Sequence, residues 1–480
     1  MTRTSRCIVA GAVAATLAAA AVAQQAAPPA APAHKLVSFF KDVRPVLTAN
    51  CSGCHQPAKA SGKIVLTSHA ALLAAVKNDE PILVAGQPDE SRLLDVLVPH
   101  DGKPPKMPKG RTPLSEKQVE LVRRWIAEGA KDDTPAAATE QFTMDHPPVY
   151  AQLPVVTTLD FSHDGKLLAV SGYHEVLLYE VDGPGTGAKL AARLVGLSER
   201  IQSVAFSPDG TQLLVVGGSP ARLGEVEFWD VAQRKLRLSI PLGFDTLYGG
   251  SWSPDGKLVA LGGGDNTVRA LDAEKGEQLF FNAASEDLVL DTAFSTDGSH
   301  LVSVGRDRAL KLFQVATQQF LDNITSITPG ALKGGLMALD RHPTSDVLLI
   351  GGADGTPKTY KMYRTKDRVI GDDFNLVKAY SPLAGRIFAA EWSPDGMRFV
   401  AGSSSAGAGE VRLYAADQEA PAWSVTMPAG VYAAAWRAAN PAAAAEPLLV
   451  AVGGFDGRVL LLDGADGRIV NSFAAAPLKL

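Results

Sequence analysis

Two hydrophobic periodicities divide the chain near residue 140. Before that point, apolar residues recur at intervals of three and four, which is the spacing of one helix face. This spacing occurs over residues 37–47 and again over residues 119–126, where Gly129 ends the run. After about residue 149, apolar and polar residues alternate with a period of two over short stretches, which predicts β-strands. The pattern therefore predicts a small all-α domain followed by a much larger all-β domain.

A tight-turn motif recurs through the β region. Copies of Ser-X-Asp-Gly begin at Ser162, Ser207, Ser253, Ser295 and Ser393, a sixth slot begins at His342, and a degenerate seventh begins at Trp436. The first four copies are about 42–46 residues apart, close to the roughly 40–45 residues of a four-stranded blade. Four short strands per unit and seven units over residues 149–480 predict a seven-bladed β-propeller. The aspartates of the motif are expected to stabilise the turns through bonds to the backbone, not to act in catalysis.

The third strand of each unit carries the second feature of the repeat. It ends in an apolar or aromatic pair, and Phe228-Trp229-Asp230 has a full Trp-Asp pair. These repeats resemble the WD-repeat family, and the resemblance implies a rigid ring suited to holding a protein partner on its face. Two closures of the ring are open. Residues 469–473 complete the last blade alone, or residues 141–150 supply its edge strand.

The motif Cys51-Ser52-Gly53-Cys54-His55 stands in the helical part. Two cysteines separated by two residues and followed by histidine are the attachment signature of a c-type haem. Structural zinc is the competing interpretation, but it usually needs four ligands, and the mature chain has no other cysteine. A redox CxxC motif would stand at the head of a helix after a strand, and the sequence around Cys51 does not suggest that placement. The motif therefore predicts one covalently attached haem c, with Cys51 and Cys54 as its anchors and His55 as an axial iron ligand.

Met107 is the candidate for the second axial ligand. It lies between Pro105 and Pro108, on a proline-stiffened loop before the last predicted helix, and His/Met ligation is usual in cytochromes c. The rivals are His100 and His69. A loop methionine is otherwise more often a space-filling residue than a ligand.

Several further motifs lie in order around these residues. They are Phe-Lys-Asp-Val-Arg-Pro-Val-Leu at 40–47, Ser-Gly-Lys-Ile-Val-Leu at 61–66, Gly-Gln-Pro at 86–88, Met-Pro at 107–108 and Trp-Ile-Ala-Glu-Gly-Ala at 125–130. With the CxxCH motif, residues 36–131 resemble the planctomycete-type cytochrome c domain. The resemblance implies a class I cytochrome fold, covalent haem on Cys51 and Cys54, and His55 and Met107 as the iron ligands.

The first residues have the features of a targeting segment. A positive start with Arg3 and Arg6, an apolar run and the Ala21-Val22-Ala23 site predict a signal peptide over 1–23. An uncleaved anchor is the alternative, although the run is shorter than the roughly 20 residues of a spanning helix. We therefore expect a periplasmic or otherwise exported protein without a membrane span in the mature chain. A Pro/Ala spacer at 24–35 and a linker at 132–148 separate the predicted parts.

Net charge and site chemistry narrow the function. A formal charge of −5 indicates no nucleic-acid partner. We expect an exported mono-haem cytochrome that transfers single electrons, with the propeller as a protein-docking platform. A redox partner protein could dock at the basic residues around Met107, namely Lys103, Lys106, Lys109 and Arg111, although a solvated loop is the simpler interpretation.

The alternative function is a periplasmic oxidoreductase whose propeller holds a substrate or second cofactor. Nitrite reductases join a haem c domain to a propeller, but those propellers have eight blades and a buried histidine ligand. Quinoprotein dehydrogenases use eight blades with tryptophan-rich repeats. The histidines here, His163, His174, His300 and His342, fall in turns or at strand edges. The electron carrier is therefore favoured over an enzyme, and enzyme activity is left open.

Overall fold

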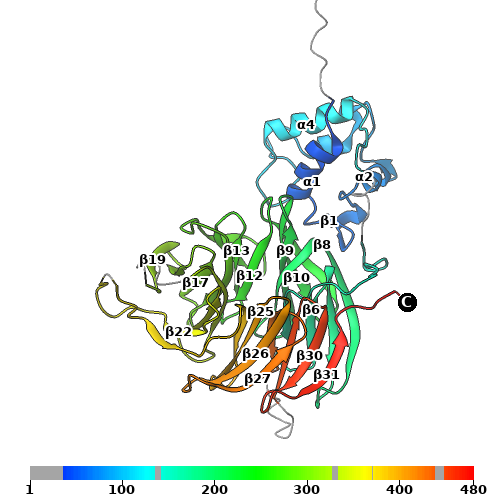
Figure 1. The fold of residues 1–480 in the computed structure, drawn as a ribbon. Coiled ribbons are helices and arrows are strands. Elements are labelled where there is room, and N and C mark those ends of the chain that lie inside the picture. Colours follow the sequence, from blue (N-terminus) through cyan, green and yellow to red (C-terminus); the bar gives the residue numbers. More distant parts are fainter. Residues whose placement is uncertain (1–35, 136–141, 327–332, 370, 438–447, 480) are drawn as a thin grey trace, which may run out of the picture. The chain divides into compact units, whose positions relative to one another are not determined.

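The computed structural model describes residues 36–135, 142–326, 333–369, 371–437 and 448–479 (Figure 1). The predicted signal peptide, the Pro/Ala spacer and the centre of the predicted linker lie outside the described residues. Within them, a region of short helices (blue to cyan in Figure 1) precedes a long series of β-strands (green to red). The two-part division that hydrophobic periodicity predicts is therefore present.

Seven short helices build the first region. They are the π-helix η1 (Phe39–Val43), α1 (Arg44–Asn50), the 3₁₀ turn η2 (Ser61–Lys63), α2 (His69–Ala74), the 3₁₀ turn η3 (Pro88–Glu90), α3 (Arg92–Asp95) and α4 (Glu116–Ala127). The Ser115 hydroxyl accepts the Gln118 N–H while the Gln118 side chain accepts the Ser115 N–H, a capping box that starts α4. The predicted terminal helix is thus confirmed, and the predicted first helix begins as a π turn.

The region is mixed, which corrects the prediction of an all-α domain. Two short antiparallel ladders join the helices: β1 (His55–Gln56) pairs with β2 (Lys59–Ala60), and β3 (Val76–Lys77) pairs with β4 (Glu80–Pro81). Two-residue ladders leave no room for an alternating pattern, so periodicity could not reveal them.

The core of this region forms where α4 packs against the first helices. Trp125 and Phe39 are fully buried with ring centroids 5.3 Å apart, and His69 lies edge-on to both rings. Leu47, Leu72 and Ile126 extend the same cluster. Because Cys51 packs at the edge of this cluster, the core holds the CxxCH segment in place.

One seven-stranded sheet opens the β region. Its strands, in spatial as well as chain order, are β5 (Leu159–Phe161), β6 (Leu167–Ser171), β7 (Tyr173–Val181), β8 (Ala188–Phe206), β9 (Gln212–Ser219), β10 (Leu223–Asp230) and β11 (Lys235–Pro241). The long strand β8 pairs with β7 along its first half and with β9 along its second half. The sheet is therefore two antiparallel four-strand units that share one continuous strand.

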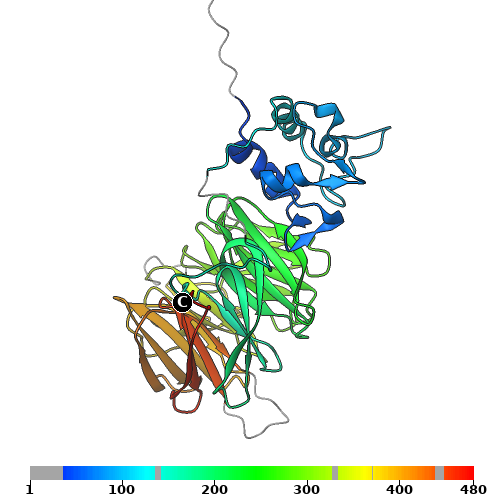
Figure 2. The same cartoon turned by 90° about the vertical axis from the view of Figure 1, so that its right-hand side faces the viewer.

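Five four-stranded antiparallel sheets follow (Figures 1 and 2). The first two are β12 (Leu247–Trp252), β13 (Leu258–Gly263), β14 (Val268–Asp272), β15 (Gln278–Asn282) and β16 (Val289–Phe294), β17 (His300–Gly305), β18 (Leu310–Gln314), β19 (Gln319–Asn323). The third is β20 (Leu336–Arg341), β21 (Val347–Gly352), β22 (Lys358–Lys361), β23 (Leu376–Ala379). The last two are β24 (Arg386–Trp392), β25 (Arg398–Ser405), β26 (Ala408–Ala415), β27 (Pro421–Met427) and β28 (Val431–Trp436), β29 (Leu449–Gly454), β30 (Arg458–Asp463), β31 (Ile469–Ala474).

The repeated turns behave as predicted. In the turn at Ser207, the serine hydroxyl donates to Asp209 Oδ1, and that same oxygen accepts the Thr211 N–H at 3.0 Å. The other four Ser-X-Asp-Gly copies make the same pair of bonds. These hydrogen bonds lower the pKa of the turn aspartates, the Ser207 hydroxyl contributing most at Asp209. The aspartates are therefore turn-forming groups.

The final sheet is completed by the last strand of the chain's described part. Strand β31 pairs with β30 and supplies the fourth strand from the chain's own end. Tyr150 adds only an isolated parallel bridge to Leu478. The first and last sheets then meet through β5 and β28, and the Val156 N–H donates to the Gly454 carbonyl at 2.9 Å. Of the two predicted closures, the structure has the first.

Candidate functional site

The CxxCH motif forms a single tight turn after α1. The N–H groups of Cys54 and His55 both donate to the Cys51 carbonyl, at 3.1 and 3.0 Å. This bonding places the two cysteines about one helical turn apart along one side of the segment. Both thiols are free; Cys51 is half-buried and Cys54 is exposed. Burial, with a smaller effect of Cys54, raises the pKa of the Cys51 thiol to about 12, so this thiol is neutral near pH 7.

His55 is oriented by a backbone carbonyl. Its Nδ1 lies 3.2 Å from the Ile64 oxygen. Because a carbonyl oxygen only accepts, Nδ1 carries the proton and Nε2 keeps its lone pair. A metal-binding histidine is typically held in this way, by donating its other ring N–H to a carbonyl. The geometry thus leaves His55 Nε2 available for a metal.

Met107 is held by its backbone and free at its side chain. Its N–H donates to the Val96 carbonyl at 2.9 Å, and its side chain is 36% exposed. The two rival histidines are engaged elsewhere. His69 Nε2 lies 2.7 Å from the Ala130 carbonyl, and His100 Nε2 lies 2.8 Å from the Asp95 carbonyl. Each rival histidine thus has one ring nitrogen against a backbone carbonyl, and the place of Met107 as an iron ligand stays a prediction.

The basic residues around Met107 are all solvent-exposed. Lys103, Lys109 and Arg111 lie on the loop surface, and Lys106 Nζ is 3.7 Å from an Asp95 carboxylate oxygen. Such an exposed pair contributes little to stability. The loop therefore presents positive charge to solvent near Met107.

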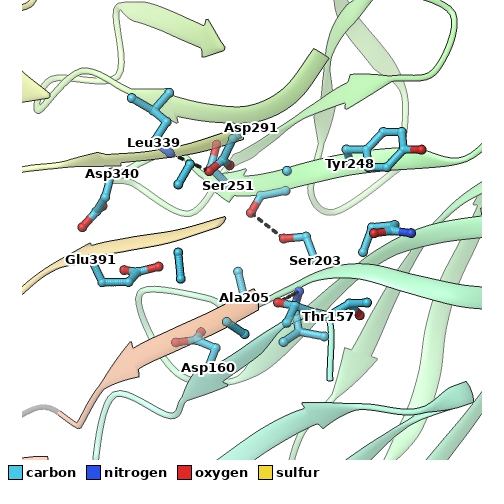
Figure 3. A pocket seen from close by; sticks show the side chains of 18 of the residues that line it. Thr157, Asp160, Ser203, Ala205, Tyr248, Ser251, Asp291, Leu339, Asp340 and Glu391 are labelled. Atoms are coloured by element: carbon cyan, nitrogen blue, oxygen red, sulfur yellow. Dashed lines mark hydrogen bonds between the residues drawn. The ribbon is translucent and has the colours of Figure 1, made fainter. Parts of the chain in front are cut away.

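A second candidate site lies among the innermost strands of the sheets, around a cavity of about 600 Å³. Four carboxyl groups from different sheets line it, those of Asp160, Asp291, Asp340 and Glu391 (Figure 3). Sequence reasoning missed this cluster, because it places no two carboxylates together. Residues 160, 340 and 391 do share one slot of the repeat, two residues before the turn motif. An alignment of the repeats with one another could have found them.

Three of these carboxyl groups bind the backbone of the next inner strand. Asp160 accepts the Phe206 N–H, Asp291 the Leu339 N–H and Asp340 the Trp392 N–H, at 2.7–3.0 Å. These bonds connect β5 to β8, β16 to β20, and β20 to β24. The bonds of Asp291 and Asp340 therefore join neighbouring sheets, and that of Asp160 joins two strands of the seven-stranded sheet. This is a structural role.

Burial dominates the electrostatics of the cavity. It raises the pKa of Asp160 and of Asp291 to about 7 and that of Asp340 to about 6, against the backbone hydrogen bonds that lower them. For Glu391, burial comes first and repulsion from Asp340, Asp160 and Asp291 adds to it, so its pKa is well above the ordinary value. Near neutral pH the lining holds fewer negative charges than its composition suggests.

The described part of the chain has neither a cluster of metal-ligating side chains nor a helix that could span a membrane. There, no three or more His, Cys, Asp or Glu side chains gather as a metal ion would require. The described helices are all too short or too polar to cross a bilayer. The propeller histidines make ordinary contacts; His342, for example, lies edge-on to Trp392 with ring centroids 5.0 Å apart.

Comparison with protein families separates the chain into the same two parts. Residues 51–110 match the planctomycete cytochrome C family, and residues 277–314 match the WD domain, G-beta repeat. The first match covers the CxxCH motif, Met107 and the basic loop up to residue 110. That family implies haem c, and the Cys51–Cys54 spacing is consistent with it.

Individual relatives share the β region at low identity. The chain is 23% identical over 291 residues to the WD repeat-containing protein 26 homolog of Arabidopsis thaliana, covering 54% of this chain and 48% of that protein. It is 28% identical over 214 residues to eukaryotic translation initiation factor 3 subunit I of Aspergillus terreus, covering 42% and 60%. It therefore spans about half the length of such relatives. The chain joins a planctomycete cytochrome C domain to a WD-repeat region of four-stranded antiparallel blades.

Proposed function

We propose that the protein is an exported mono-haem c-type cytochrome that transfers single electrons, and that its propeller is a docking platform for a protein partner. The observation that carries the proposal is the CxxCH turn, in which the Ile64 carbonyl holds His55 Nδ1 and leaves Nε2 free. A zinc or disulfide role for this motif lacks support, because the described residues offer no further cysteine or clustered ligand.

The residues present fit a covalently bound haem. The free thiols of Cys51 and Cys54 would form its thioether links, and His55 and Met107 would be its axial ligands. Bound haem c supplies a one-electron redox couple. The protein's own part is to orient the imidazole through Ile64, to hold the Met107 backbone on Val96, and to pack Cys51 against the core around Trp125.

The proposed number of blades rests on the pairing of β8. Because this strand pairs with β7 in one half and with β9 in the other, the seven-stranded sheet counts as two blades. With the five four-stranded sheets, the proposed ring has seven blades. A ring of rigid blades offers an extended face for binding, and the exposed Lys103, Lys106, Lys109 and Arg111 would steer an acidic redox partner. Export agrees with covalent haem attachment, which takes place outside the cytoplasm.

A second candidate function is an oxidoreductase whose propeller holds a substrate or a second cofactor. The cavity lined by Asp160, Asp291, Asp340 and Glu391 favours it. Three of the four carboxyl groups, however, accept backbone N–H groups of other inner strands, which is a structural use, so the carrier remains the better supported function.

The deciding experiment is a visible spectrum and a pyridine haemochrome assay of protein expressed with the c-type maturation machinery. One covalent haem per chain is the expected result, with none in the Cys51→Ala/Cys54→Ala variant. A second, extractable chromophore would support the oxidoreductase instead. A protein without haem in the same expression host would overturn the carrier.

A further inference from the structure

The third strands β7, β10, β14, β18, β22, β26 and β30 share one feature. In each, the pairing with the fourth strand shifts register immediately before a large buried residue, and this makes the positions two residues earlier equivalent. In β7 and β30 that position is a leucine, whereas in the other five it is charged, namely Glu227, Arg269, Lys311, Lys358 and Arg412.

Four of the five charged positions hold a cation paired with a carboxylate. Arg269, Lys311 and Lys358 each bond to the aspartate four residues earlier. In β26, Arg412 Nε donates to Glu410 Oε1 at 2.6 Å. The fifth charged position, Glu227, differs from these four because it is an acid.

A comparison of β10 with β26 shows how the site of Glu227 differs from that of Arg412. They read Gly-Glu-Val-Glu-Phe-Trp from 224 and Gly-Glu-Val-Arg-Leu-Tyr from 409. In both, a serine of the fourth strand donates to the first glutamate, Ser239 to Glu225 and Ser424 to Glu410. The two sites therefore differ mainly in that Glu227 replaces the guanidinium of Arg412.

Glu225 and Glu227 are buried against each other. Glu225 is 0% and Glu227 2% exposed, and the two acids are two residues apart on β10, so their side chains are on the same face of the strand. Trp229 Nε1 donates to Glu227 Oε2 at 2.8 Å, and the Leu197 backbone N–H lowers the pKa of Glu227. Among the described residues, Glu227 Oε1 has no partner within hydrogen-bond distance. A buried carboxylate oxygen without a donor is unfavourable. A proton on this oxygen would remove that penalty and supply the bond between the two acids.

The pair also contacts β8 where that strand passes from one blade to the next. Ser198 Oγ donates to Glu225 Oε2 at 2.9 Å. The Gly196 backbone approaches Glu227 Oε1 so closely that a Cβ there would collide with it. Residues 196–198, called the crossover below, lie at a register shift of the β7–β8 ladder. This shift falls between Val195, which pairs with β7, and Arg200, which pairs with both β7 and β9. The two carboxyl groups thus connect β10 to the crossover.

The nearest charges do not neutralise the pair. Arg193 on β8 is bound to Glu175 of β7, and Arg237 on β11 bonds to Gln212 and lies over Phe228. Glu199, next to the crossover, acts on the pKa of His174. Among the largest effects on the pKa of the two groups, the one charge is that of Glu225 acting on Glu227, and the Gln56 side chain of β1 lowers the pKa of Glu225.

We propose that Glu225 and Glu227 share one proton, which takes the place of the Arg412 cation and fastens the crossover of β8 between two blades as a pH-sensitive joint. When the pair loses this proton to solvent, two carboxylates face each other without a cation, and the crossover loosens. Burial, and for Glu227 also the charge of Glu225, raises the pKa of both groups, which favours a proton on the pair.

The sign of the pH effect follows from linkage. The folded pair holds a proton that unfolded glutamates release near their ordinary pKa of roughly 4.3. Between that value and the raised folded pKa, folding takes up one proton, so the equilibrium constant for closing the joint falls about tenfold per pH unit. Closure is complete at low pH and weakens as the pH rises.

Amide hydrogen exchange at the crossover, corrected for the intrinsic pH dependence of exchange, tests this in the full holoprotein. The wild type should lose protection as the pH rises through the raised pKa of the pair. Glu227→Gln, whose amide donates permanently to Glu225, should keep its protection, so the two proteins diverge by up to tenfold per pH unit. The matched control is Glu410→Gln, which removes the carboxylate of the β26 pair and should leave the pH dependence at residues 196–198 as in the wild type.

Two further readouts guard against a variant that does not fold. Glu227→Arg rebuilds the arrangement of β26 and should also abolish the pH dependence. The infrared carbonyl band of a buried protonated carboxyl should be present in the wild type and reduced in Glu227→Gln. Equal pH dependence in the wild type and both Glu227 variants, or no such band in the wild type, would overturn the proposal.

Discussion

In the helical region, three of the four proposed haem-binding side chains lie within the five consecutive residues of the CxxCH turn, and backbone bonds inside that turn set their spacing. In the sheets, by contrast, the carboxyl groups of the cavity come from strands separated by tens of residues, and bonds between sheets bring them together. A site whose side chains are positioned by one local turn is therefore sensitive to single substitutions. A site whose side chains come from repeated strands depends on many similar contacts between those strands.

Removing the thiols should have the largest effect. Cys51→Ala/Cys54→Ala removes both covalent attachment points, so we expect complete loss of covalent haem while the sheets stay folded. Haem staining after denaturing electrophoresis measures the covalent haem, and circular dichroism measures whether the sheets stay folded. Haem that survives denaturation in this variant would show that the attachment lies elsewhere.

Trp125→Ala tests how far the helical region depends on one side chain. Trp125 is buried, packs on Phe39 and His69, and donates to the Lys131 carbonyl at 3.0 Å. Its truncation should lower the free energy of unfolding by about 3–5 kcal/mol, which is much of what a small domain has. Thermal unfolding followed by the haem band measures this. A shift below about 1 kcal/mol would contradict the proposed core.

Met107→Ala should alter the haem without releasing it. Loss of the thioether ligand predicts unchanged haem content, loss of the weak near-infrared-edge band of methionine ligation, and a lower reduction potential. Met144→Ala is a suitable control, because Met144 has a similar exposure (39% against 36%) and lies outside the candidate site. If both variants keep the band, Met107 is not the ligand.

Asp291→Asn addresses the cavity through its pH dependence. Burial raises the folded pKa of Asp291 to about 7, so its contribution to stability is full below the unfolded pKa and is lost as the pH rises towards 7. The wild type should lose up to about 1.4 kcal/mol per pH unit from this group over that window. Asparagine keeps an acceptor for the Leu339 N–H and should remove this part of the slope in urea unfolding. The turn variant Asp209→Asn is the control, because the pKa of Asp209 is lowered instead.

The exposed lysines should give the smallest effect. Lys103→Glu/Lys106→Glu/Lys109→Glu reverses the charge near Met107, and we expect reduction by an anionic reductant to slow by about tenfold at low salt, with the difference vanishing at high salt. The control Lys257→Glu changes an equally exposed lysine of a propeller turn. A rate that does not depend on salt in either protein would remove the basic loop from the proposed docking surface.

Local signals were readable from the sequence. The Ser115 start of α4 and the turn aspartates such as Asp209 act through partners two or three residues away, and the structure confirms them. The short β1–β2 and β3–β4 ladders were missed, because two-residue strands carry no period. The engagement of His69 with Ala130, 61 residues away, was equally invisible.

By itself, the sequence determined the CxxCH turn, the helix and strand periodicities and the length of the repeat, because these depend on neighbours within a few residues. Only the tertiary structure decided which distant groups the buried acids contact. Asp291 reaches Leu339 48 residues further along the chain, and Glu225 reaches Ser198 27 residues before it. Burial at such contacts moves the proton affinity of these carboxyl groups, and burial follows from how the sheets pack, which no stretch of sequence specifies alone.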